Sequence, residues 1–169
     1  MKTVSFKILF TLLFFTLCRN SKAQSWQWVY PEISLSNYNF FYDIAHDSKG
    51  YLYAAGTLAN TSTLGNITVN NNGIADYLIA KFDTMGNYKW VRNNGLGVAT
   101  NKSAQIRSIC IDAQDNIYAV GNFSDSLIVG NDTLIEPFSQ FGSGFIMKMD
   151  TAGNYIWASP SLLPFMVIL

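Results

Sequence analysis

The chain has 169 residues, enough for a domain with a hydrophobic core, and its 11 basic and 11 acidic residues balance. This balance excludes the strongly basic surface that would attract nucleic acid or an anionic membrane. Charged residues make up 13% and aromatic residues 15% of the chain, a mixture that favours short strands joined by tight turns over a helical bundle.

The N-terminal segment predicts a secretory signal. Lys2 and Lys7 precede an apolar run over residues 8–17, and Ser21-Lys22-Ala23 places small residues at positions −3 and −1 of a cleavage site. The run is too short to cross a hydrocarbon core of about 30 Å. We therefore expect cleavage after Ala23, with no membrane span afterwards and a secreted or cell-surface location. Lipidation at Cys18 is the alternative.

The cysteines indicate no internal disulfide. Cleavage would remove Cys18, one of the two cysteines, and leave Cys110 alone. Cys110 lies in the alternating stretch Ile109-Cys110-Ile111, so we expect a buried small apolar side chain rather than a reactive thiol.

Strand patterns follow one another along the rest of the chain. An aromatic stretch over 26–30 comes first, and two later sets of strands share one order: a hairpin around an Asp-rich turn, a polar stretch with a short apolar rise, a nearly continuous apolar strand and a strand containing Trp. We expect each polar stretch to form a small protruding hairpin or loop, and each apolar strand to be buried on both faces. The first set occupies 42–46, 51–55, 57–73 (rise at 67–69), 77–82 and 88–91, and the second 107–111, 117–120, 122–142 (rise at 127–129), 145–149 and 155–158.

The second set repeats the first. The segment from Asp112 to Gly121 repeats the one from Asp47 to Gly56 after 65 residues, and Lys148–Trp157 repeats Lys81–Trp90 after 67. Four antiparallel strands per repeat form the blade of a β-propeller. We therefore predict an all-β fold of antiparallel four-stranded propeller-blade repeats, incomplete, with about two blades and the N-terminal stretch as a closing strand.

The repeated motifs resemble those of the secreted bacterial β-propeller repeat (SBBP-type) family. Its blades read Asp-x-(Phe/Tyr)-(Val/Leu)-x-Lys-x-Asp-x-x-Gly-Asn-x-x-Trp and Asp-x-x-Gly-Asn-(Ile/Val)-Tyr-x-x-Gly. The matching residues are Asp76, Tyr77, Leu78, Lys81, Asp83, Gly86, Asn87 and Trp90 for the first, and Asp112, Asn116, Ile117, Tyr118 and Gly121 for the second, with Asp115 where Gly is usual. The match covers about Trp26–Trp157. It implies the propeller-type fold, but it does not indicate which ligand the protein binds.

The signal pattern and the repeats predict a domain division, and the resemblance implies a missing part. We expect a signal peptide over 1–23, propeller-type repeats over 24–158 (repeat one about 42–90, repeat two about 107–157) and a divergent apolar tail over 159–169. Closed propellers need at least about four blades. We therefore expect a fragment of a longer protein, and the alternative is self-association that completes a ring.

Each residue type that suggests chemistry has a structural interpretation that we favour. The Asp-x-x-Gly-Asn segments fit β-turns better than calcium loops. The repeated lysines are expected to pair with an Asp of a neighbouring blade, with their stems on aromatic rings. The tryptophans are expected to pack between blades rather than to bind sugars. His46 is the only histidine, so neither a catalytic triad nor a histidine metal cluster is indicated. The segments begin at Asp47, Asp83, Asp112 and Asp150, the lysines are Lys81 and Lys148, and the tryptophans are Trp26, Trp28, Trp90 and Trp157.

No residue is therefore assigned a catalytic, cofactor-binding or metal-binding role, and no cofactor is expected. We predict a non-enzymatic, exported structural or binding module at the cell surface. It would present the loops over 57–73 and 122–142 to an unknown protein or glycan, and not to nucleic acid. The alternative is a fragment of a propeller enzyme, similar to a lyase or lactonase, with a metal in its central channel.

Overall fold

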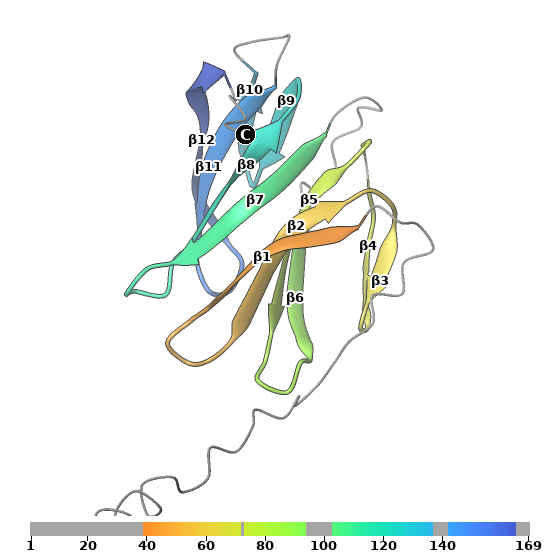
Figure 1. The fold of residues 1–169 in the computed structure, drawn as a ribbon, viewed down its shortest axis with the longest axis vertical. Helices are drawn as coiled ribbons and strands as arrows, with labels where there is room; N and C mark the ends of the chain where they lie inside the picture. Colours follow the sequence, from red (N-terminus) through yellow and green to blue (C-terminus); the bar gives the residue numbers. More distant parts are fainter. Residues whose placement is uncertain (1–38, 72, 94–102, 137–141, 165–169) are drawn as a thin grey trace, which may run out of the picture.

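A computed structural model describes residues 39–71, 73–93, 103–136 and 142–164 of the chain, with side chains up to residue 161. These residues form twelve β-strands and no helix (Figure 1). The predicted all-β class is therefore confirmed. None of the described residues lies in a helix that could cross a membrane. The predicted signal peptide, the aromatic stretch 26–30 and residues 165–169 lie outside the described part.

The strands form two antiparallel four-stranded sheets, each with a small hairpin inserted between its second and third strands. The first blade has the order β1-β2-β5-β6, and the second has the order β7-β8-β11-β12. In the first blade the strands are β1 (Phe40–His46), β2 (Leu52–Leu58), β5 (Asp76–Phe82) and β6 (Tyr88–Asn93), with the hairpin β3 (Ser62–Leu64) and β4 (Ile67–Val69). In the second they are β7 (Ala104–Ile111), β8 (Ile117–Phe123), β11 (Ser143–Met149) and β12 (Tyr155–Pro164), with the hairpin β9 (Ser126–Val129) and β10 (Asp132–Ile135). Residues 159–164 of the predicted tail thus continue β12.

The inserted hairpins repeat as closely as the blades do. Each turns through a Gly-Asn pair whose glycine has φ 61°, and glycine at the first central position is typical of a type II′ hairpin. The glycine packs on the tyrosine that begins the fourth strand: a Cβ on Gly65 would lie 2.9 Å from Tyr88 Cδ2, and one on Gly130 would lie 3.1 Å from Tyr155 Cβ.

The predicted small hairpins are confirmed, but each lies against its own blade instead of protruding freely. One face of each hairpin is buried, because it covers apolar residues of its own blade. Both predicted apolar rises lie in hairpin strands, 67–69 in the second strand of its hairpin and 127–129 in the first strand of the other. The buried apolar residues of the hairpins are Leu64, Val69, Leu127, Val129 and Leu134.

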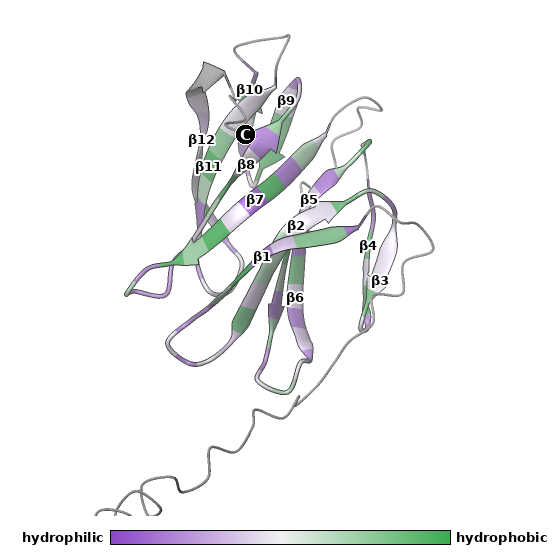
Figure 2. Ribbon diagram, in the orientation of Figure 1, coloured by the Kyte–Doolittle hydropathy of each residue, from purple (hydrophilic) through white to green (hydrophobic). Residues whose placement is uncertain are grey.

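The main hydrophobic core lies between the two blades, which stack face to face (Figure 1). Figure 2 shows apolar residues along the strands of both sheets. An isolated parallel bridge between Ala75 and Ser103 joins the blades at one end of this interface. The first blade contributes Tyr53, Ala55, Tyr77 and Ile79, and the second contributes Ile106, Ile109, Ala119, Phe145 and Met147, among others.

A glycine in each second strand faces a β-bulge in the first. β1 is bulged between Phe41 and Asp43, and β7 carries the same irregularity one repeat later. A Cβ on Gly56 would lie 1.8 Å from the carbonyl oxygen of Phe40, and one on Gly121 would lie 1.9 Å from that of Gln105. Glycine is required here by the close approach of the backbone, and not by a positive φ.

The two apolar third strands differ in burial. Every residue of β5 is buried, as the sequence predicts. In β11 the residues alternate, and Ile146 is 38% exposed while Met147 is 0% exposed. The expectation that both faces of β11 are buried is therefore wrong, because no described element covers the outer face of the second blade.

Candidate functional site

Four equivalent turns close the hairpins at one end of the blades. In each, the Asp Oδ1 atom accepts hydrogen bonds from the N–H groups two and four residues later, as Asp83 does from Met85 at 3.0 Å and Asn87 at 2.9 Å. The fourth residue has a positive φ, between 63° and 85°. The predicted interpretation as turns is confirmed, since these Asp oxygens are occupied by the backbone. Asp47, Asp112 and Asp150 make the same bonds.

Asp115, which replaces the usual glycine of the motif, links the two blades. The carboxylate of Asp115 accepts hydrogen bonds from the N–H of Ser48 at 2.9 Å and from its hydroxyl at 2.7 Å. These bonds lower the pKa of Asp115 and keep it ionised. Asp43 makes a similar link from the first blade, because it accepts bonds from the Ser108 hydroxyl at 2.6 Å and the Ile109 N–H at 2.9 Å.

Three side chains of the first blade bind main-chain carbonyls of the second. The Lys81 ammonium and the Trp90 indole N–H both donate to the Thr151 oxygen, at 3.0 and 3.1 Å. The Arg92 Nε donates to the Gly153 oxygen at 3.0 Å. Trp90 thus packs between blades as predicted. Arg92 was not singled out from the sequence, because its counterpart in the second repeat is Ser159.

The predicted partner of the repeated lysines is wrong in one respect. Lys81 pairs with Asp47 at 3.7 Å and Lys148 with Asp112 at 3.8 Å, and both aspartates belong to the same blade as the lysine. The expected aromatic surroundings are confirmed, since Lys81 lies 4.2 Å from the centroid of the Tyr51 ring and Lys148 lies 4.9 Å from that of Tyr118. Burial lowers the pKa of Lys81, although Asp47 opposes the shift.

The remaining candidates are dispersed. The His46 Nδ1 atom lies 3.2 Å from the carbonyl oxygen of Asp47, at the end of β1. Trp157 is 38% exposed, so the prediction that it packs between blades is wrong for the described part of the chain. Cys110 is exposed, so the predicted buried position is wrong. In the described part of the chain, no three His, Cys, Asp or Glu residues are grouped so that they could hold a metal ion. Trp26 and Trp28 lie outside the described residues.

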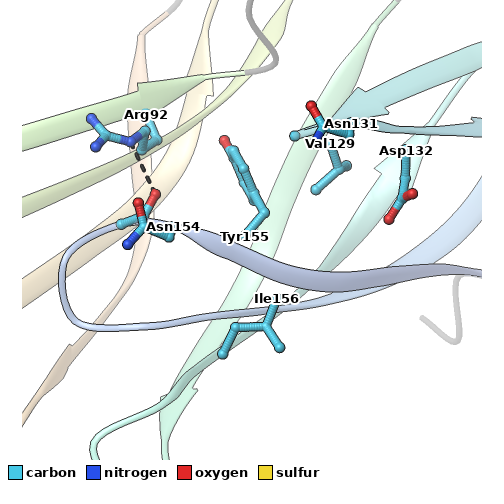
Figure 3. A pocket seen from close by; sticks show the side chains of 9 residues that line it. Arg92, Val129, Asn131, Asp132, Asn154, Tyr155 and Ile156 are labelled. Carbon is cyan, nitrogen blue, oxygen red and sulfur yellow. Dashed lines mark hydrogen bonds between the residues drawn. The ribbon is translucent and has the colours of Figure 1, made fainter.

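A polar cleft of about 520 Å³ opens where the hairpin β9–β10 meets the first blade. Figure 3 shows Asn131 and Asp132 on one side, Arg92 and Asn154 on the other, and Tyr155 between them. The Tyr155 hydroxyl lies 2.7 Å from the Tyr77 hydroxyl, and burial raises the pKa of both tyrosines. Since Arg92 and Tyr155 already join the blades, this cleft is largely part of their interface.

An aromatic pocket of about 460 Å³ lies where β1 and β7 begin. The rings of Phe40 and Tyr42 stack with centroids 6.2 Å apart and an angle of 27°, and both are exposed. The Gln105 Oε1 atom is buried and has no hydrogen-bond partner among the described residues. The Arg107 guanidinium lies 5.0 Å from the centroid of the Tyr42 ring. The lining residues are Phe40, Tyr42, Thr57, Ala59, Asn60, Ile74, Ala75 and Gln105.

This pocket combines a predicted loop with residues that the sequence analysis missed. The loop 57–73 contributes Thr57, Ala59 and Asn60, whereas the loop 122–142 contributes to the polar cleft instead. A signal for Phe40 and Tyr42 was present in the sequence, because these aromatic residues do not repeat: Gln105 and Arg107 occupy their positions one repeat later. Positions that differ between otherwise similar repeats are candidates for binding.

Comparison with known proteins gives a partial likeness to a repeat protein. The chain is 29% identical over 105 residues to the uncharacterized WD repeat-containing protein L264 of Acanthamoeba polyphaga mimivirus. The match covers 56% of this chain and 7% of that protein, so the chain spans a small part of its relative. No family model matches the chain. The likeness agrees with a β-propeller-type repeat, and membership of the SBBP-type family stays a prediction.

Proposed function

We propose that the chain is part of an exported, non-catalytic β-propeller-type binding module whose aromatic pocket binds a neutral glycan. The pocket carries this proposal, because it exposes two stacked rings beside the Gln105 amide oxygen, which has no hydrogen-bond partner among the described residues. Aromatic faces pack on the apolar face of a sugar ring, and amide groups bond its hydroxyls. The volume is within the range of about 300–1,000 Å³ that ligand sites occupy.

The uncharged lining favours a glycan over an acidic or basic ligand. None of the residues that line the pocket is charged, and the nearby Arg107 guanidinium lies against the Tyr42 ring. The similarity to a WD repeat-containing protein supports a binding role in general, and the SBBP-type motifs and the N-terminal signal pattern support export to the cell surface.

Calorimetric titration with neutral oligosaccharides of several linkages tests the pocket. We expect one of them to bind, and Tyr42→Ala to weaken binding by about 1–2 kcal/mol, roughly 5–30-fold. Ile135→Ala is the matched control, because Ile135 is an exposed apolar residue that does not line the pocket. Equal affinities of the Tyr42→Ala variant and the wild type would contradict the proposal, as would binding of a protein ligand alone.

Export is tested separately. Expression of the full chain in a Gram-negative host, followed by cell fractionation and N-terminal sequencing, should give a product outside the cytoplasm that begins at Gln24. An uncleaved product that stays in the cytoplasm would refute export and leave the glycan test unaffected.

A further inference from the structure

The outer face of the second blade carries several of the same residue types, at matching positions, as a face that is buried elsewhere in the molecule. Across its strands lies the row Cys110, Tyr118, Lys148, Trp157, paired in register. The corresponding row of the first blade is Ala45, Tyr53, Lys81, Trp90. The first-blade row is packed against the second blade, whereas no described element covers the second-blade row.

The next row shows the difference in burial most clearly. Ala55 and Ile79 of the first blade are both 0% exposed, while Val120 and Ile146 at the same positions of the second blade are 41% and 38% exposed. Apolar residues on neighbouring strands that remain this exposed mark a surface for association.

The polar groups of this face identify the kind of occupant. In the first blade the corresponding Lys and Trp donate to a carbonyl of the turn Asp150–Asn154. Lys148 and Trp157 make no such bond to another sheet in the described part of the chain. The occupant should therefore be a blade that carries an Asp-x-x-Gly-Asn turn.

The first blade carries the complementary surface on its own outer side. Its turn Asp83–Asn87 has the same hydrogen bonds as Asp150–Asn154, and Met85 in it is 71% exposed. Phe41 and Ile44 are exposed by 37% and 59%, although their counterparts Ile106 and Ile109 are buried in the interface between the blades.

We propose that the chain self-associates head to tail, with the outer face of the second blade docked on the outer face of the first blade of another copy. The new interface would repeat the one between the two blades of a single chain. Since the described part of each copy supplies two blades, two to four copies would give about four to eight blades, the range of closed propellers.

The test uses sedimentation velocity on the full chain over a range of concentrations, with one variant on each surface. The wild type should associate, whereas Ile146→Arg and Ile44→Arg should each be monomeric, because each removes one half of every interface. An equal mixture of the two variants should form dimers and no larger species, since the intact first-blade surface of one variant can pair with the intact second-blade surface of the other. Ile135→Arg, on neither surface, should associate as the wild type does.

Restoration by mixing also shows that both variants are folded. A wild type that is monomeric at all concentrations would overturn the proposal. Association that survives Ile44→Arg would overturn it too, and would indicate pairing of two second-blade faces instead. Variants that are each monomeric and do not restore each other would also refute a head-to-tail interface.

Cys110 provides a second measurement at the same surface. Its counterpart Ala45 packs against the core between the blades, so docking should cover the exposed thiol. In a full chain with Cys18→Ser, alkylation of Cys110 should slow several-fold as the protein concentration rises. Adding Ile44→Arg should abolish this dependence, and a rate that is independent of concentration in both proteins would contradict the proposal.

Discussion

Met147 and Ile146 are adjacent on β11 and face opposite sides of the second blade, so they offer a direct measure of what the interface between the blades contributes. Met147 is 0% exposed within the core between the blades, and Ile146 is 38% exposed on the outer face. We expect Met147→Ala to lower the free energy of unfolding by about 2–5 kcal/mol, because it removes transfer free energy and leaves a cavity. For Ile146→Ala we expect roughly 1 kcal/mol, since this side chain is already partly exposed and its loss leaves no enclosed cavity.

Urea denaturation at low protein concentration measures both changes, and the concentration is kept low so that self-association does not contribute. A typical domain has a free energy of unfolding of about 5–15 kcal/mol, so the Met147→Ala midpoint should shift clearly while the slope stays constant. Similar losses for the two variants would refute the stacking of the blades, because they would mean that both faces of β11 are covered alike.

Three further perturbations test individual contacts. Lys81→Met should lower the denaturation midpoint markedly more than Lys148→Met, because only Lys81 donates to a carbonyl of the other blade; equal shifts would argue against that contact. Gly56→Ala should prevent folding, as seen by circular dichroism, since its Cβ would lie 1.8 Å from the Phe40 oxygen. The Ser108 hydroxyl and the Ile109 N–H lower the pKa of Asp43 from its usual 3.8. The ionised carboxylate therefore stabilises the folded protein above pH 3.8, and this stabilisation is lost as the pH falls through the lower pKa of the folded state. The midpoint of Asp43→Asn should therefore depend less on pH between about 5 and 2 than that of the wild type.

The strand order of the blades followed from the sequence, because the repeat fixed which segments correspond. The Asp turns followed as well, since Asp and Gly at set positions determine local geometry without help from the rest of the chain. The contacts of Arg92 and Ser48 could not be predicted from the sequence, because each residue contacts the other blade and neither residue is repeated.

The wrong predictions concern which face of a strand is covered by another element. The alternation Ile109-Cys110-Ile111 correctly indicates that neighbouring residues point to opposite sides of β7. It does not indicate what lies against each side, and the side that carries Cys110 is uncovered. The aromatic pocket was missed for a similar reason, because Phe40 and Gln105 belong to different blades and meet only after the blades stack.

The hydrogen bonds that join the blades through the turn Asp150–Asn154 end on main-chain carbonyls. Every amino acid supplies a carbonyl, so residues such as Thr151 and Ala152 can change without loss of the acceptor. A blade copied by gene duplication would therefore fit its neighbour at once, provided that the copy keeps the turn shape and the donors Lys and Trp. The sequences of the copies could then diverge at the rim, where Phe40 and Tyr42 already differ from Gln105 and Arg107.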